Sequence, residues 1–118
     1  MSEKPLSGKV AIVTGSGKGI GRAIVKGYAT AGAQVCVTAR TQSQIDAVAD
    51  EINEAGGEAI SIACDITDPA AVKRMVDLTV DTFGGLDLVF MNAGGCLESN
   101  SIVEADPQTW RDTIEVNL

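Results

Sequence analysis

The run of residues with the clearest chemistry lies near the amino terminus and is rich in glycine. Residues 14–21 read Thr-Gly-Ser-Gly-Lys-Gly-Ile-Gly, and they follow the apolar run 10–13. Glycines let a backbone turn tightly and approach a ligand closely. The start of a helix offers unpaired N–H groups and a partial positive charge to an anion. Apolar residues with helical spacing come next, so the sequence predicts a phosphate-binding turn between a strand and a helix; these residues are Ile24, Val25, Tyr28 and Ala29.

The spacing of the glycines narrows the kind of turn. A P-loop needs Gly-x-x-x-x-Gly-Lys-Ser/Thr, and Ile20 stands where its second glycine would be. The pattern Gly-x-Gly-x-x-Gly also fails, because position 20 is Ile20 and position 22 is Arg22. Thr-Gly-x-x-x-Gly-x-Gly fits. A plain flexible turn is the alternative, and the surrounding strand–turn–helix frame disfavours it.

The elements that must position this turn follow from apolar periodicity and from cap residues. Continuous apolar strands that alternate with helices imply a parallel sheet covered on both faces. The predicted class is therefore an α/β fold, a Rossmann-type doubly wound parallel sheet in a single domain over residues 1–118, ending after the fourth strand and the start of the following helix. Strands are expected over 9–14, 34–38, 59–64 and 86–91, helices over 19–31, 44–55, 69–83 and 106–118, and a loop over 92–104. Thr67 or Asp68 is expected to cap the third helix.

Bulk composition excludes several classes of function. The net charge of −7 disfavours nucleic acid and anionic membranes as partners, because both require cationic patches. No apolar run approaches the ~20 residues of a membrane span, and the amino terminus lacks a secretory core. No metal site is expected, because the chain has no His and its three cysteines have no metal-ligand spacing. Cys36, Cys64 and Cys96 are expected to be reduced packing residues, which indicates a cytoplasmic protein.

Four short motifs, in order, resemble the classical short-chain dehydrogenase/reductase family over the full length of the chain. They are the glycine turn, Cys64-Asp65-Ile66 after the third strand, Asn92-Ala93-Gly94 after the fourth strand, and Val116-Asn117-Leu118. Met91 departs from the family, which more often has Asn there, and a small local effect is expected. The resemblance implies a nicotinamide-dependent oxidoreductase that acts on a small-molecule carbonyl or alcohol. It also implies a homo-oligomer, a dimer or tetramer, as the full-length enzyme.

The resemblance also implies roles for particular residues. Asp65 would hydrogen-bond the adenine amino group, although an alternative role for it is a turn or cap residue. Ile66 would add backbone and apolar contact. Asn92 would tie the fourth strand to its neighbour, with Ala93 and Gly94 close to the ribose. The glycine turn would hold the cofactor phosphates through Thr14, Gly15, Ser16, Gly17, Lys18, Gly19, Ile20 and Gly21.

The end of the second strand predicts which nicotinamide cofactor is used. An enzyme that selects NAD usually places a carboxylate there, on the ribose 2′-hydroxyl. Here the segment 38–41 is Thr-Ala-Arg-Thr, and the next carboxylate is Asp46, inside the expected helix. Arg40 and Lys18 instead offer two cations for a 2′-phosphate. The sequence therefore favours NADP(H), with two merely solvated charges as the alternative.

The resemblance leaves the catalytic set incomplete. The family uses a Tyr with a Lys four positions later, a Ser and an Asn. Tyr28 is followed four positions later by Gly32, so it is expected to be a packing residue. Asn117 matches the catalytic asparagine. The Ser, Tyr and Lys would lie beyond Leu118, so the chain is expected to be the amino-terminal portion of a longer enzyme or a truncated product, inactive in isolation.

Two further interpretations stay open from the sequence. One is a non-catalytic NADP(H)-binding sensor, and the other is an assembly module that pairs through the Trp110 helix. The end of the chain is also expected to leave the fourth strand as an open edge of the sheet.

Overall fold

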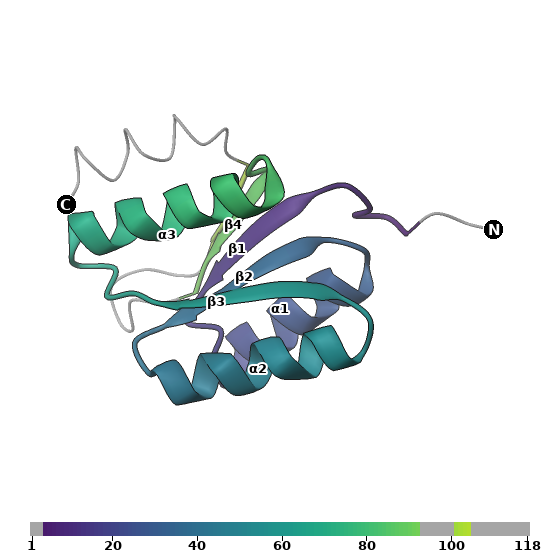
Figure 1. Cartoon of the computed structure of the whole chain (residues 1–118), viewed down its shortest axis with the longest axis horizontal. Helices are drawn as coiled ribbons and strands as arrows, with labels where there is room; N and C mark the ends of the chain where they lie inside the picture. The colour runs from purple at the N-terminus through teal and green to yellow at the C-terminus, as the bar shows by residue number, and fades with distance from the viewer. Residues whose placement is uncertain (1–3, 93–100, 105–118) are drawn as a thin grey trace.

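The computed structural model describes residues 4–92 and the backbone of residues 101–104 (Figure 1). Helices and strands alternate along most of this part of the chain. Their order is β1 (Val10–Thr14), α1 (Gly19–Thr30), β2 (Gln34–Ala39), α2 (Gln42–Glu54), β3 (Glu58–Ala63), α3 (Pro69–Phe83), β4 (Leu88–Met91) and β5 (Ser101–Glu104). The expected helix 106–118, with Trp110, lies outside the described residues, as does Cys96.

The sheet has the strand order β3-β2-β1-β4-β5. Strand β1 pairs in parallel with both β2 and β4, and β2 pairs in parallel with β3. Helix α3 lies on one side of the sheet, whereas α1 and α2 lie on the other (Figure 1). This arrangement confirms the predicted α/β, doubly wound class. The crossovers place the ends of β1 and β4, which are distant in sequence, side by side.

A fifth strand corrects the predicted loop over 92–104 and the predicted open edge of the fourth strand. Strand β5 pairs antiparallel with β4, with Leu88 opposite Glu104 and Met91 opposite Ser101. The run Ser-Ile-Val-Glu contains two β-branched apolar residues, which favour strands. Its pairing satisfies the backbone groups that β4 would otherwise expose.

Strand β4 also begins two residues later than the predicted start at 86. Asp87, the residue before β4, binds the first residue of β1 twice. The backbone N of Val10 donates to Asp87 Oδ2 over 2.9 Å, and the backbone N of Asp87 donates to Val10 O over 2.9 Å. This reciprocal pair aligns the two central strands before their ladder starts.

Two cores of buried aliphatic side chains fill the space between the sheet and its helices. Alternate residues of β1 enter opposite cores: Ala11 and Val13 pack towards α1 and α2, whereas Val10 and Ile12 pack towards α3. Cys36 and Cys64 are buried in the α3 core, as expected of packing residues. Burial raises the pKa of Cys36 to about 12, so this thiol stays protonated at neutral pH.

Two predicted helix features are present as expected. Asp68 caps α3 by accepting a hydrogen bond from the backbone N of Ala70 over 3.0 Å, and Pro69 follows at the first helical position. Tyr28 packs half-buried against the core under α1 and α2, and burial raises its pKa. This packing agrees with the role predicted for Tyr28.

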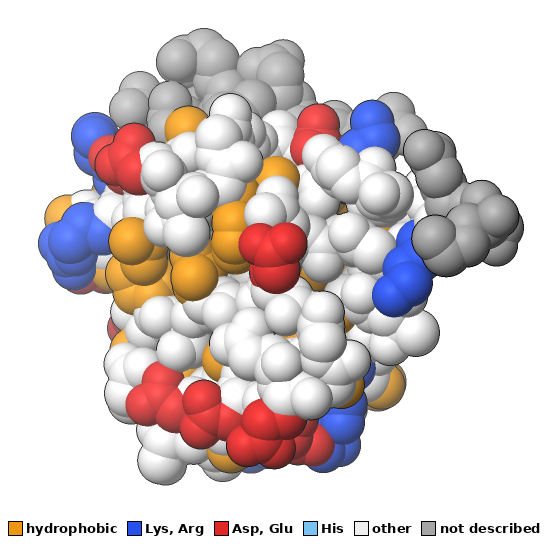
Figure 2. Space-filling view, turned by 45° about the vertical axis from the view of Figure 1, so that its right-hand side comes forward, with side chains coloured by type: hydrophobic (Ala, Val, Ile, Leu, Met, Phe, Trp, Pro, Cys, Tyr) orange, Lys and Arg blue, Asp and Glu red, His pale blue; other side chains and the backbone are white. Residues whose placement is uncertain are grey.

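The surface carries its charge unevenly. Helix α2 has three exposed acidic residues one turn apart, which are Asp46, Asp50 and Glu54. Figure 2 shows acidic side chains in a row at the bottom of that view. Within residues 4–92 and 101–104, no helix combines the length and the apolar character that a membrane span needs.

Candidate functional site

The candidate residues gather at one edge of the sheet because the strands that carry them are parallel. The register sets Thr14 beside Thr38 and Ala39 beside Ala63. The glycine turn, Arg40 and Asp65 therefore follow neighbouring strand ends, although 50 residues separate the first from the last. Ligands of open α/β sheets bind at this edge, outside the carboxyl ends of the strands.

The glycine turn leaves the start of α1 accessible. Gly15 and Gly19 have φ of +63° and +60°, in the left-handed region that favours glycine. A Cβ added to Gly19 would meet no atom within 4 Å, so this side of the turn is open. Lys18 occupies the N-cap position without a side-chain cap bond, and the first turn holds no acidic residue. The partial positive charge of the helix start is therefore not neutralised by either feature.

Gly21 serves a different purpose from Gly19. A Cβ at Gly21 would lie 2.1 Å from Gly15 O and 2.6 Å from Asn92 Nδ2. The absent side chain therefore lets α1 approach the turn and the end of β4. Asn92 Nδ2 donates to Gly15 O over 3.2 Å, and the backbone N of Asn92 donates to Thr14 Oγ1 over 2.9 Å. Asn92 thus ties β4 to β1.

Ser16 faces the protein interior and holds the turn to β2. Its side chain is fully buried. The hydroxyl donates to Val13 O over 2.7 Å and accepts from the backbone N of Thr38 over 2.9 Å, while the backbone N of Ser16 donates to Thr38 O over 3.0 Å. These bonds show that the side chain of Ser16 supports the shape of the turn, whereas its predicted role in cofactor binding stays a prediction.

Gly17 is buried against α2. A Cβ there would lie 3.0 Å from Gln44 Cβ and 3.1 Å from Gln44 Oε1. Gly17 is therefore needed for the packing of the turn on the first residues of α2. Gln44 and Thr38 were missed by sequence reasoning. The one signal for Thr38 was its place at the end of β2, whereas nothing in the motif pointed to Gln44.

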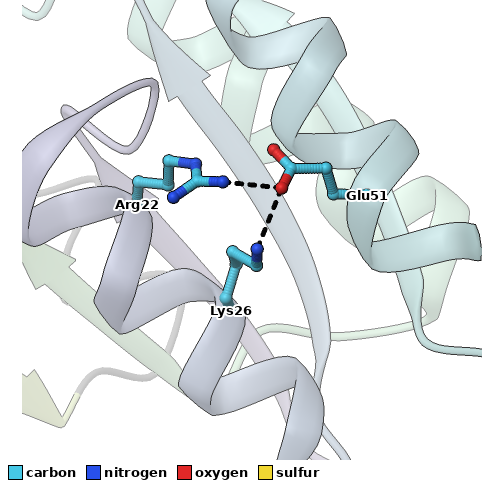
Figure 3. A network of polar contacts seen from close by, with 3 residues as sticks. All are labelled: Arg22, Lys26 and Glu51. Atoms are coloured by element: carbon cyan, nitrogen blue, oxygen red, sulfur yellow. Dashed lines mark hydrogen bonds and ion pairs between the residues drawn. The ribbon is translucent and has the colours of Figure 1, made fainter. Parts of the chain in front are cut away.

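Lys18 and Arg40 are both exposed at this edge. Neither makes an ion pair within the described part of the chain. By contrast, Arg22 and Lys26 of α1 both bind Glu51 of α2, at 2.6 Å and 2.9 Å (Figure 3). These two bonds also lower the pKa of Glu51, the Lys26 bond most strongly.

The first carboxylate after Arg40 in the sequence is that of Asp46, and it binds two other side chains. Asp46 lies within α2, as predicted, and its Oδ1 accepts from Gln42 Nε2 and from Ser61 Oγ, each over 2.7 Å. The segment between β2 and α2 thus presents the cation of Arg40 and no carboxylate.

Asp65 holds the turn that follows β3. Its Oδ1 accepts from the backbone N of Thr67 over 2.9 Å and from Thr67 Oγ1 over 2.7 Å. The hydroxyl bond lowers the pKa of Asp65 most, and the positive charge of Arg40 lowers it further. The turn role considered from the sequence is therefore present, and the carboxylate is ionised at neutral pH.

The remaining candidates differ in how they are placed. Ile20, the second residue of α1, has a side chain that is 68% exposed at the open start of the helix. Ile66 is half-buried next to Asp65. Ala93, Gly94 and Asn117 lie outside the described residues.

In the part of the chain that is described, no group of three His, Cys, Asp or Glu residues could hold a metal ion.

A cavity of about 330 Å³ lies away from this edge, where α1 and α2 end. The carboxyl-terminal ends of both helices contribute to its wall, which includes Lys4, Lys26, Glu51, Gly57 and Glu58. None of the candidate residues lines it. Among the described residues, the candidate site thus lies apart from this cavity, at the carboxyl edge of the sheet.

Comparison with known proteins gives a consistent set of relatives. The family model described as short chain dehydrogenase matches residues 9–118. An uncharacterized oxidoreductase of Mycobacterium tuberculosis is 37% identical over 113 residues, covering 96% of this chain and 43% of that protein.

Solved structures agree in fold as well as in sequence. A hydroxysteroid dehydrogenase from Escherichia coli superposes with a TM-score of 0.74 at 41% identity, over 76% of this chain and 38% of that one. A 7α-hydroxysteroid dehydrogenase complexed with NADH and 7-oxo glycochenodeoxycholic acid superposes with a TM-score of 0.71 at 38% identity, over 74% of this chain and 34% of that one. The chain thus spans less than half of the length of each of these relatives.

Proposed function

The chain belongs to the short-chain dehydrogenase family, and from this premise we propose that it is the NADP(H)-binding part of an oxidoreductase that acts on a carbonyl or alcohol. The single observation that carries the choice of cofactor is the pair of exposed cations, Lys18 and Arg40, with no carboxylate between β2 and α2. The domain is taken to occupy residues 1–118.

The start of α1 supports the phosphate part of the proposal. The open space at Gly19 allows a pyrophosphate to approach the backbone, and the unblocked helix start attracts its charge. Ile20 would cover the ligand with an apolar side chain. Ser16, Gly17, Gly21 and Asn92 would hold the turn in shape from behind, as their contacts with β2, α2 and β4 indicate.

The choice between NADP(H) and NAD(H) rests on this chain's own residues, since one solved relative is complexed with NADH. A 2′-phosphate would be repelled by a carboxylate and attracted by the guanidinium of Arg40, which can bind it with two hydrogen bonds. Lys18 would approach the same phosphate from the glycine turn. Asp65, at the next strand end, would accept a hydrogen bond from the adenine amino group.

The chemistry would be hydride transfer between the nicotinamide and the substrate carbon. We assign Asn117 the role of holding a water in the proton relay of the family. The other three catalytic residues of the family, Ser, Tyr and Lys, have no match in the sequence at hand. We therefore expect the 118-residue chain to bind the nucleotide and not to catalyse. For the complete enzyme we propose a cytoplasmic homo-oligomer, a dimer or tetramer.

Calorimetric titration of the chain with NADPH and with NADH tests the proposal. The expected result is that NADPH binds more tightly, because only its 2′-phosphate engages Arg40 and Lys18. Equal or tighter binding of NADH would contradict the cofactor choice. A chain that is folded by circular dichroism but binds neither nucleotide would contradict the proposed site altogether.

A further inference from the structure

One side chain of α2 binds both backbone groups of a single residue in β3. Asn53 Nδ2 donates to Ala59 O over 3.1 Å, and the backbone N of Ala59 donates to Asn53 Oδ1 over 2.8 Å. A neighbouring strand would offer the same donor and acceptor to one residue. The amide of Asn53 thus occupies the position of a strand partner at Ala59.

The backbone N–H and C=O groups of Ala59 point away from β2 and the rest of the sheet. Strand β3 is the first in the strand order and pairs only with β2 among the described strands. Cys64 N donates to Ala39 O, so residue 64 and the alternate residues 62 and 60 face β2. The intervening residues 59, 61 and 63 therefore face outward. Figure 1 shows α2 running alongside this edge.

A second residue of α2 binds the side chain of Ser61, two residues further along β3. Ser61 Oγ donates to Asp46 Oδ1 over 2.7 Å, and this bond lowers the pKa of Asp46 most. An ionised carboxylate is therefore held at Ser61, two helical turns from Asn53. Charged side chains at an exposed strand are a known means of preventing further strands from pairing with it.

The edge needs such protection because of its own sequence. Residues 59–63 read Ala-Ile-Ser-Ile-Ala, without charge or proline. A short, uncharged and β-branched segment on a sheet edge favours pairing with an identical segment. The strand that such an edge attracts first is β3 of a second copy of this chain.

We propose that α2 closes the outer edge of β3 against pairing with β3 of a second copy, with the amide of Asn53 as the closing group. The helix thus has two roles, since its other face packs on the sheet through Ile45, Val48, Ala49 and Ile52. This role is independent of nucleotide binding, because Asn53 lies in the last turn of α2, away from the glycine turn.

The test compares Asn53→Ala with the matched variant Glu54→Ala. Glu54 is exposed and adjacent, and its side chain makes no hydrogen bond or ion pair within the described residues. In a dilute solution of the Asn53→Ala variant, hydrogen exchange at the Ala59 amide should be about fivefold faster than in the wild type, as expected for one lost hydrogen bond. In concentrated solution this variant should sediment as a larger species than wild type, and the Ser61 and Ala63 amides should become protected. Glu54→Ala should match wild type in both measurements.

Asn53→Asp separates the two bonds of the amide. The carboxylate can still accept from the Ala59 N–H but cannot donate to the Ala59 carbonyl, and its charge still opposes pairing. It should therefore keep Ala59 slower to exchange than in Asn53→Ala, and it should sediment as wild type does. The proposal is overturned if Asn53→Ala exchanges faster at Ala59 but does not associate further, since Asn53 would then cap only its local turn. An unchanged rate of hydrogen exchange at Ala59 in Asn53→Ala would also overturn the proposal.

Discussion

Asn92 and Gly15, which are 77 positions apart, are joined by a hydrogen bond of 3.2 Å from Asn92 Nδ2 to Gly15 O. The bond fixes the end of β4 against the beginning of the glycine turn. Gly21 lies against both partners, and its lack of a side chain makes the approach possible. The shape of the candidate site therefore depends on three residues that need not contact a ligand.

Gly21→Ala should destabilise the fold, because its Cβ would overlap Gly15 O and Asn92 Nδ2. We expect a loss of about 1–3 kcal/mol in the free energy of unfolding, the usual range for overpacking. Gly27→Ala is the matched control in the same helix, with no atom within 4 Å of its Cβ. The control should be stabilised by about 0.5–1 kcal/mol through helix propensity. Denaturant unfolding measures both, and equal effects would contradict the packing role of Gly21.

Gly19→Val should abolish binding of NADPH and of NADH, since its side chain would fill the open space at the start of α1. The residue has φ +60°, so the substitution also strains the backbone, by about 1–2 kcal/mol. Gly56→Val controls for that strain, because Gly56 has φ +93° and equally open surroundings at the end of α2. The control should lose stability and keep its affinity for nucleotide by calorimetry. Retained binding by Gly19→Val would show that the phosphates lie elsewhere.

Arg40→Asp should weaken NADPH binding much more than NADH binding. Each charge-assisted hydrogen bond to a 2′-phosphate would contribute about 1.5–3 kcal/mol, and the new carboxylate would add repulsion. Lys9→Asp makes the same change in net charge at the exposed residue before β1, at the opposite edge of the sheet. Calorimetric titration of both variants with both nucleotides separates a local contact from a general charge effect. An equal loss for the two nucleotides in Arg40→Asp would show that Arg40 does not contact the 2′-phosphate.

The contact between α1 and α2 predicts a pH dependence of stability. Bonds from Lys26 and Arg22 lower the pKa of Glu51 below its ordinary value of 4.5. A depressed folded-state pKa stabilises the fold above the unfolded value, and that stabilisation is lost as the pH falls below 4.5 towards the folded value. Glu51→Gln should therefore reduce the slope of stability against pH in this acid range.

Glu54→Gln is the control for this measurement, since Glu54 forms no ion pair in the described part of the chain. Thermal unfolding across the acid range, at low and at high salt, measures the slope. Because the pair is exposed, salt should reduce the difference between wild type and Glu51→Gln. A variant with the same acid slope as wild type would contradict a stabilising role for the pair.

Most of the fold could be predicted from the sequence because its inner strands β1 and β2 are buried on both faces. Such strands are continuous apolar runs, and the glycine and proline signals between them mark where helices end and begin. Strand β5 could not be predicted this way. It has only four residues, and what makes it a strand is the exposed edge of β4, which periodicity within the segment does not report.

The location of the candidate site could be predicted, but not the part that each residue plays. Parallel topology brings Thr14, Arg40 and Asp65 to one edge, and this follows from the order of elements alone. The motif does not reveal which way a side chain points. Ser16 therefore turned out to face Thr38, and Gly17 turned out to make room for Gln44.

The strand ends are also connected sideways by hydroxyl groups. Thr14 Oγ1 accepts from Asn92, Ser16 Oγ accepts from Thr38, and Thr38 Oγ1 donates to Ile62 O over 2.8 Å. These bonds cross from β4 to β1, from the glycine turn to β2, and from β2 to β3. These bonds hold the strand ends and the glycine turn in fixed positions relative to one another. If a dinucleotide binds there as proposed, little of its binding energy would be spent on ordering the backbone.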